Sequence, residues 1–145
     1  QKIAEMLDCD EKEIFDKKKR SGILGYFRGG WDAYREKKTD IYNNNNGLIN
    51  HDHSIIGTPV WAGKPTPAIR TYIKKRKQHF QKVSFFCTYG GSGGEKTFDE
   101  MKNLSEKEPI ETLGISEDEV KEENFEVKVK KFVESIEKQG SNKKK

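Results

Sequence analysis

Two glycine-rich stretches decide the fold of this chain: Gly57-Thr58-Pro59-Val60-Trp61-Ala62-Gly63 and Cys87-Thr88-Tyr89-Gly90-Gly91-Ser92-Gly93. Each follows a short apolar run that is typical of a buried strand, and each precedes a segment with helical spacing. Carboxyl ends of parallel strands meet at one edge of a sheet. We therefore expect the two stretches to form the two sides of one flat ligand site.

Short apolar runs alternate with amphipathic segments along the rest of the chain. Strands are predicted at 13–15, 54–57, 83–87 and 109–113. Helices are predicted at 1–8, 23–38, 65–80, 97–104 and 125–136, with a charged turn at 17–22 and an Asn-rich loop at 43–47. Thr66 is expected to cap its helix and Pro67 to lie in the first turn. This alternation predicts an α/β protein with a parallel sheet and helices on both faces.

Length and composition favour a single domain with a polar surface. The chain has 145 residues, of which 32% are hydrophobic and 36% are charged. We expect one domain over residues 1–139, ended by Gly140, and a disordered basic tail at 140–145. No apolar run approaches the roughly 20 residues of a membrane span, and we expect neither a span nor a secretory signal. Two cysteines, Cys9 and Cys87, suggest no disulfide framework and favour a cytoplasmic protein.

The charge pattern gives a weaker indication of partners. The net charge is +4, basic runs lie at 17–20, 74–77 and 143–145, and acidic residues collect at 95–126. Such runs attract nucleic acid, anionic membranes or acidic proteins, but they also occur as ordinary solvated helix faces. No aromatic interleaving or base-reading motif accompanies them, so specific nucleic-acid binding is not predicted.

The two glycine-rich stretches carry the candidate chemistry. Trp61 and Tyr89 are large aromatic residues at predicted strand ends, where two rings can face each other across a planar ligand. Glycines beside them leave backbone amides free to contact the ligand's polar edge. The hydroxyl of Thr58 is expected to point into the mouth of the cleft. The alternatives are a Trp61 ring folded back onto the sheet edge and a flexible turn before Thr97.

Two other candidates are weak. His51-Asp52-His53 has two imidazoles at two-residue spacing on a strand but no third ligand, so no metal site is predicted. Cys87 lacks a histidine at a matching strand end, and packing beside the ligand site is favoured over a nucleophilic role.

These stretches resemble the flavodoxin family over essentially the whole chain. Residues 57–70 are similar to the family's first flavin-ring loop and following helix, residues 85–93 to its second flavin-ring loop, and residues 1–4 to the start of its first helix. The short connection after Leu113 resembles the short-chain form. The resemblance implies a flavodoxin-like sheet in the order 2-1-3-4-5, FMN bound non-covalently, electron transfer and redox partner proteins. It implies contacts to the flavin from two sets of residues: Thr58, Pro59, Val60, Trp61, Ala62 and Gly63; and Cys87, Thr88, Tyr89, Gly90, Gly91 and Gly93.

The sequence also departs from this family. The family's first strand and phosphate loop lie just before the residues that match Gln1-Lys2, and this sequence does not contain them. Three explanations stay open: residues precede Gln1 in the molecule, which we favour; a neighbouring chain supplies the strand; or FMN is no longer held tightly. The chain is also basic, whereas flavodoxin carriers are usually acidic. The choice between carrier and FMN-dependent oxidoreductase stays open, as does a cofactor-free interaction module that docks an acidic partner.

Overall fold

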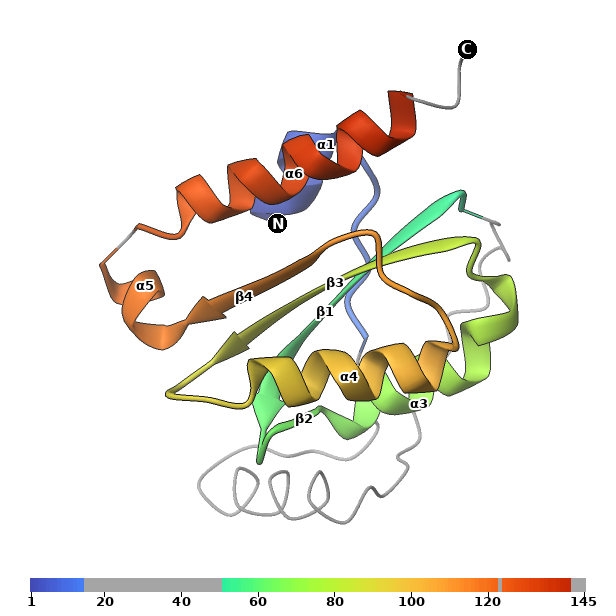
Figure 1. The fold of residues 1–145 in the computed structure, drawn as a ribbon, viewed down its shortest axis with the longest axis horizontal. Helices are drawn as coiled ribbons and strands as arrows, with labels where there is room; N and C mark the ends of the chain where they lie inside the picture. The colour runs from blue at the N-terminus through green and yellow to red at the C-terminus, as the bar shows by residue number, and fades with distance from the viewer. Residues whose placement is uncertain (15–50, 123, 142–145) are drawn as a thin grey trace.

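The computed structural model describes residues 1–14, 51–122 and 124–141, which form a sheet with helices on both faces (Figure 1). Its strands are β1 (His53–Trp61), β2 (Lys64–Pro65), β3 (Lys82–Tyr89) and β4 (Thr112–Ser116). The order in the described sheet is β2-β1-β3-β4. β1, β3 and β4 are parallel, and β2 pairs antiparallel with the end of β1. The α/β class and the parallel sheet are therefore confirmed.

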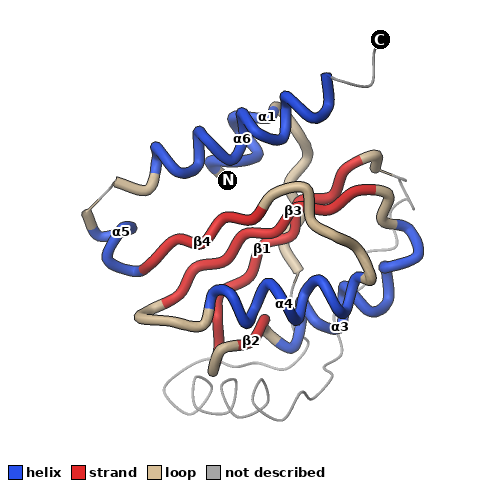
Figure 2. Tube along the Cα trace, viewed as in Figure 1, coloured by secondary structure: helices blue, strands red, loops and turns tan. Residues whose placement is uncertain are grey.

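Helices cover both faces of the sheet (Figures 1 and 2). On one face lie α3 (Pro67–Arg76), the 3-10 helix η1 (Lys77–His79) and α4 (Gly94–Ser105); on the other lie α1 (Lys2–Leu7) and α6 (Glu126–Ser141), while α5 (Glu117–Lys121) follows β4 directly. None of the described helices combines the length and the apolar composition that crossing a bilayer requires.

Two apolar clusters, one on each side of the sheet, hold these layers together. The first joins β1 and β3 to α3 and α4, and its fully buried members include Ile73, Val83, Phe85 and Met101. The second joins β4 to α6 through Leu113, Ile115, Val129, Phe132, Val133 and Ile136. β3 is covered on both faces, which explains why its sequence reads as a nearly continuous apolar run.

Several predicted element boundaries were wrong, each for a local reason. β1 continues through Trp61, because β2 pairs with its last two residues and extends the ladder. β4 begins at Thr112 rather than Pro109, since proline has no N–H to donate; Ile110 and Glu111 already bond to β3. α4 begins at Gly94, three residues earlier than predicted, and α6 runs through Gly140 to Ser141.

The structure describes only part of the N-terminal third. The helix at 1–8 is confirmed as α1. Residues 13 and 14 have no regular structure, which does not support a strand at 13–15. The rest of that strand, the turn at 17–22, the helix at 23–38, the loop at 43–47 and the last residues of the tail lie outside the described residues. The five-strand order 2-1-3-4-5 is therefore not confirmed, although the last three predicted strands neighbour one another as that order requires.

The amino end of β1 carries a polar pair that connects it to β3. The Nε2 atom of His53 lies 3.0 Å from the Oγ atom of Ser84, a residue of β3 that has no exposed surface. The two polar side chains satisfy each other across the parallel pair. Among the described residues, no group of three or more His, Cys, Asp or Glu side chains is placed to hold a metal ion.

His53 makes folding stability depend on pH. Burial, and then the nearby charge of Lys82, lower the pKa of His53 below its usual 6.5. The unfolded chain therefore binds a proton between the two pKa values when the folded chain does not, so stability falls as the pH drops below about 6.5. We expect the free energy of unfolding, measured in urea, to decrease from pH 7 to pH 5. In the His53→Gln variant this decrease should be smaller by the contribution of His53. A His51→Gln variant, which removes an exposed histidine nearby, is expected to keep the wild-type slope; equal slopes in all three proteins would contradict the assignment.

Candidate functional site

A cavity of about 600 Å³ opens at the carboxyl ends of β1 and β3. The residues that line it come from the turn after β1, the end of β3, the connection from β3 to α4 and the first turn of α4: Ala62, Gly63, Tyr89, Ser92, Gly93, Gly94, Glu95 and Lys96. The two glycine-rich stretches thus meet at one edge of the sheet, as expected from the sequence. A cavity of this size is ordinary for a small-molecule ligand.

One side of the cavity is a tight hairpin turn. Trp61 pairs with Lys64, so only Ala62 and Gly63 connect β1 to β2. Both residues have positive φ, 51° and 73°, as a two-residue hairpin of the favoured kind requires. Alanine is strained in this conformation, whereas glycine is not. We call these two residues the hairpin turn.

The other side is the segment that leads from β3 into α4, and it touches the hairpin turn directly. Gly93 has φ 99°, and a Cβ atom built on it would lie only 2.9 Å from the Cα atom of Gly63 and 3.1 Å from Cγ1 of Val60. Glycine is therefore required at this position for two independent reasons: its backbone conformation and the close backbone approach. The contact between Gly93 and Gly63 fixes how far apart the two sides of the cavity stand.

The ring of Tyr89 is held in place by two further glycines. A Cβ atom on Gly94, at the start of α4, would lie 3.2 Å from Cε1 of Tyr89, and one on Gly114, in β4, would lie 3.0 Å from the same atom. The ring thus lies against backbone on two elements while it also lines the cavity. Tyr89 is consequently a fixed aromatic surface rather than a mobile loop residue.

Gly114 gives a test of this arrangement, because it is outside the cavity lining. A Gly114→Ala substitution is expected to push the Tyr89 ring and to destabilise the fold by about 1 kcal/mol. In a Tyr89→Ala background the added methyl group meets no ring, so the same substitution should cost much less. Urea unfolding of the two single variants and the double variant measures this coupling; strictly additive effects would show that the ring does not lie against Gly114.

Trp61 does not occupy the place that its sequence context suggested. It is the last residue of β1, half-buried, and it is not among the residues that line the cavity. Val60 and Tyr89 both pack on the cluster beneath α3 and α4, so side-chain alternation places Trp61 on the opposite face of the sheet. The expected pair of facing rings is therefore not formed. Trp61 was predicted to lie in a loop, where its side chain could face Tyr89, but in a strand successive side chains point to opposite faces.

The remaining predicted residues fall into two groups. Thr58 and Cys87 are buried inside their strands, whereas Pro59, Thr88, Gly90 and Gly91 are exposed. Contrary to expectation, the Thr58 hydroxyl does not face the cavity: it donates to the carbonyl of Pro59 at 2.9 Å and accepts from the amide of Thr66 at 3.1 Å. A Cβ atom built on Gly91 would meet no heavy atom within 4 Å, which leaves the backbone of Gly91 open to approach.

Cys87 is a packing residue next to Gly94, which lines the cavity. Its side chain has no exposed surface, and burial, with a contribution from Glu95, raises the pKa of the thiol to about 11. The neutral thiol dominates at physiological pH, and a neutral thiol is a poor nucleophile. The expectation that Cys87 packs rather than reacts agrees with this environment.

Sequence reasoning missed four of the lining residues: Ser92, Gly94, Glu95 and Lys96. These residues precede Thr97, where the helix was predicted to begin. The predicted start was too late because a glycine pair, Gly93-Gly94, is typical of a helix breaker. The signal that marks the true start is Glu95, an acidic residue of the kind that favours the first turn of a helix. The free amides of this turn and the positive end of the helix dipole lie beside the cavity.

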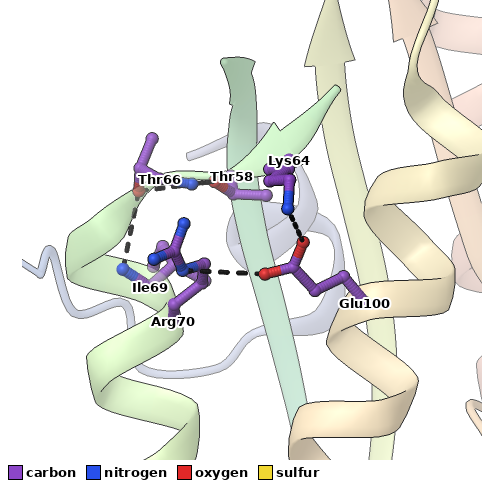
Figure 3. Close-up of polar contacts among 6 residues, drawn as sticks. All are labelled: Thr58, Lys64, Thr66, Ile69, Arg70 and Glu100. Atoms are coloured by element: carbon purple, nitrogen blue, oxygen red, sulfur yellow. Dashed lines mark hydrogen bonds and ion pairs between the residues drawn. The ribbon is translucent and has the colours of Figure 1, made fainter. Parts of the chain in front are cut away.

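A polar network behind the hairpin turn ties it to both neighbouring helices (Figure 3). Thr66 accepts from the amide of Ile69 at 3.5 Å and caps α3, which confirms the predicted cap. One turn later, the Nε atom of the buried Arg70 lies 3.6 Å from a carboxylate oxygen of Glu100 in α4. The other oxygen of Glu100 lies 4.0 Å from Nζ of Lys64 in β2. Glu100 therefore joins cations from two elements.

The fold is shared with a flavoprotein of known structure. The crystal structure of a flavoprotein in complex with FMN from Lactobacillus acidophilus NCFM superposes with a TM-score of 0.65 over 83% of this chain and 85% of that chain, at 22% sequence identity. No protein-family model and no curated protein sequence matches the chain. The similarity establishes a common fold.

Proposed function

We propose that this chain is a flavodoxin-like protein that binds FMN in the cavity between the hairpin turn and the first turn of α4, and that it transfers electrons. The observation that carries the proposal is the position of the cavity: the carboxyl ends of two adjacent parallel strands, where both glycine-rich stretches meet. Open α/β sheets bind their ligands at this edge. The FMN bound by the L. acidophilus flavoprotein, a protein of the same fold, supports the choice of ligand.

The residues present suit a flat, partly polar ring. Tyr89 supplies an aromatic surface, and Ala62, Gly63 and Gly93 supply backbone without bulky side chains. Amides of Gly90, Gly91 and Ser92 can contact the polar edge of the ring. The neutral Cys87 thiol, which packs next to Gly94, adds no charge near the site. Bound FMN supplies one- or two-electron redox chemistry; the protein holds the ring and excludes water from its buried side.

The direct test is a titration of the complete natural protein with FMN, followed by flavin fluorescence and visible absorbance. We expect saturation at one FMN per chain, with changed fluorescence and a shifted absorbance band, and a reduction potential different from that of free FMN. Absence of saturable binding would reject the proposal and leave the cofactor-free interaction module as the alternative.

A further inference from the structure

We infer that Glu100 is a positioning residue, which fixes the hairpin turn against α4 by holding Lys64 and so sets the opening of the cavity. Glu100 lies on α4, the helix whose first turn lines one side of the cavity. Lys64 immediately follows Gly63, which lines the other side. The ion pair between these two residues, drawn in Figure 3, therefore connects the two sides. Neither Lys64 nor Glu100 is among the residues that line the cavity.

Burial makes the position of Glu100 well defined. The side chain of Arg70 is 2% exposed and that of Glu100 is 21% exposed, so the carboxylate is anchored to α3 by a cation that has almost no contact with solvent. Lys64, at 23% exposure, is also largely shielded. Reduced exposure weakens solvent screening and fixes the geometry better than at a surface pair. The carboxylate thus offers β2 a rigid anchor point.

An anchor on α4 stabilises the hairpin turn, because the turn is short and strained. β2 has only two residues, and Ala62 is in a strained positive-φ conformation. The Thr58–Thr66 hydrogen bond fixes the base of the hairpin, and the Gly63–Gly93 contact sets its closest approach. Attraction between Lys64 and Glu100 opposes movement of the turn away from α4.

The chain offers a matched control for Lys64. Lys77, in η1, pairs with Glu106, the C-cap residue of α4. This pair lies at the carboxyl end of α4, whereas the cavity lies at its amino end. A Lys64→Met variant removes a cation next to the hairpin turn, and a Lys77→Met variant removes one that is remote from the cavity. Both variants keep the Arg70–Glu100 pair, so neither is expected to unfold the protein. Lys64→Arg restores a cation and serves as the rescue variant.

Amide hydrogen exchange of the FMN-free protein is the first measurement. We expect exchange at residues 62–64 to be about threefold to fivefold faster in Lys64→Met, and unchanged in Lys77→Met and Lys64→Arg. Unchanged exchange in Lys64→Met, or equal acceleration in Lys64→Met and Lys77→Met, would overturn the positioning role. This measurement does not depend on flavin.

The flavin titration is the second measurement, and it rests on the proposed function. We expect the dissociation constant for FMN to rise about threefold to fivefold in Lys64→Met, with the wild-type value in the Lys77→Met and Lys64→Arg variants. If Lys64→Met changes exchange but binds FMN like the wild type, the claim that Glu100 sets the cavity opening is overturned. If the wild type itself binds no FMN while exchange responds as expected, the proposed function fails and the positioning role stands.

Discussion

A Gly93→Ala variant is expected to lose about 3 kcal/mol of stability and most of its affinity for FMN. The added methyl group would collide with the backbone of Gly63 at 2.9 Å, and φ 99° is unfavourable for alanine. Side-chain rotation relieves neither the collision nor the unfavourable φ, because the nearest atom and the strained angle both belong to the backbone. The hairpin turn must therefore move away from α4, which changes the separation of the two sides of the cavity. Urea unfolding and an FMN titration measure the two effects.

Gly91→Ala is the matched control, since it lies in the same segment. Its Cβ position has open space around it and its φ is not positive. We expect a stability within about 0.5 kcal/mol of the wild type. If both alanine variants behaved alike, the Gly63–Gly93 contact would have no special role.

A Glu100→Leu variant is expected to cost about 3 kcal/mol, because it leaves the charge of the buried Arg70 without its carboxylate. Combining it with Arg70→Met replaces the whole pair by apolar side chains, and we expect the double variant to recover most of the loss. Glu108→Leu removes an exposed pair with Lys102 and should change stability by less than about 0.5 kcal/mol. Chemical unfolding of Glu100→Leu, Arg70→Met and the double variant gives the coupling energy of the pair, and Glu108→Leu serves as the control. A double variant as unstable as the sum of the single ones would show that the pair does not act as a unit.

The meeting of the two glycine-rich stretches was predictable because it depends on local signals. Apolar strands followed by glycine and helical spacing place both stretches at carboxyl ends, and parallel pairing then brings them together. The cap by Thr66 is equally local, since the residue bonds an amide three positions later.

The side-chain arrangement of the site depends on residues far apart in the sequence. Trp61 belongs to a strand because β2 pairs with it, and strand alternation then turns its ring away from Tyr89. The Tyr89 ring is placed by Gly114, 25 positions later in the chain. The pairing of Arg70 with Glu100 likewise follows from helix packing, which no local pattern in the sequence predicts.

The most direct test of the flavin site is an NMR titration of the amide signals of the complete, isotope-labelled protein with FMN. We expect saturable shifts concentrated at Ala62, Gly63 and residues 89–96, which form and border the cavity. The same titration of Gly93→Ala should show much weaker shifts. No saturable shift, or shifts confined to a surface away from these residues, would contradict a flavin site between the hairpin turn and α4.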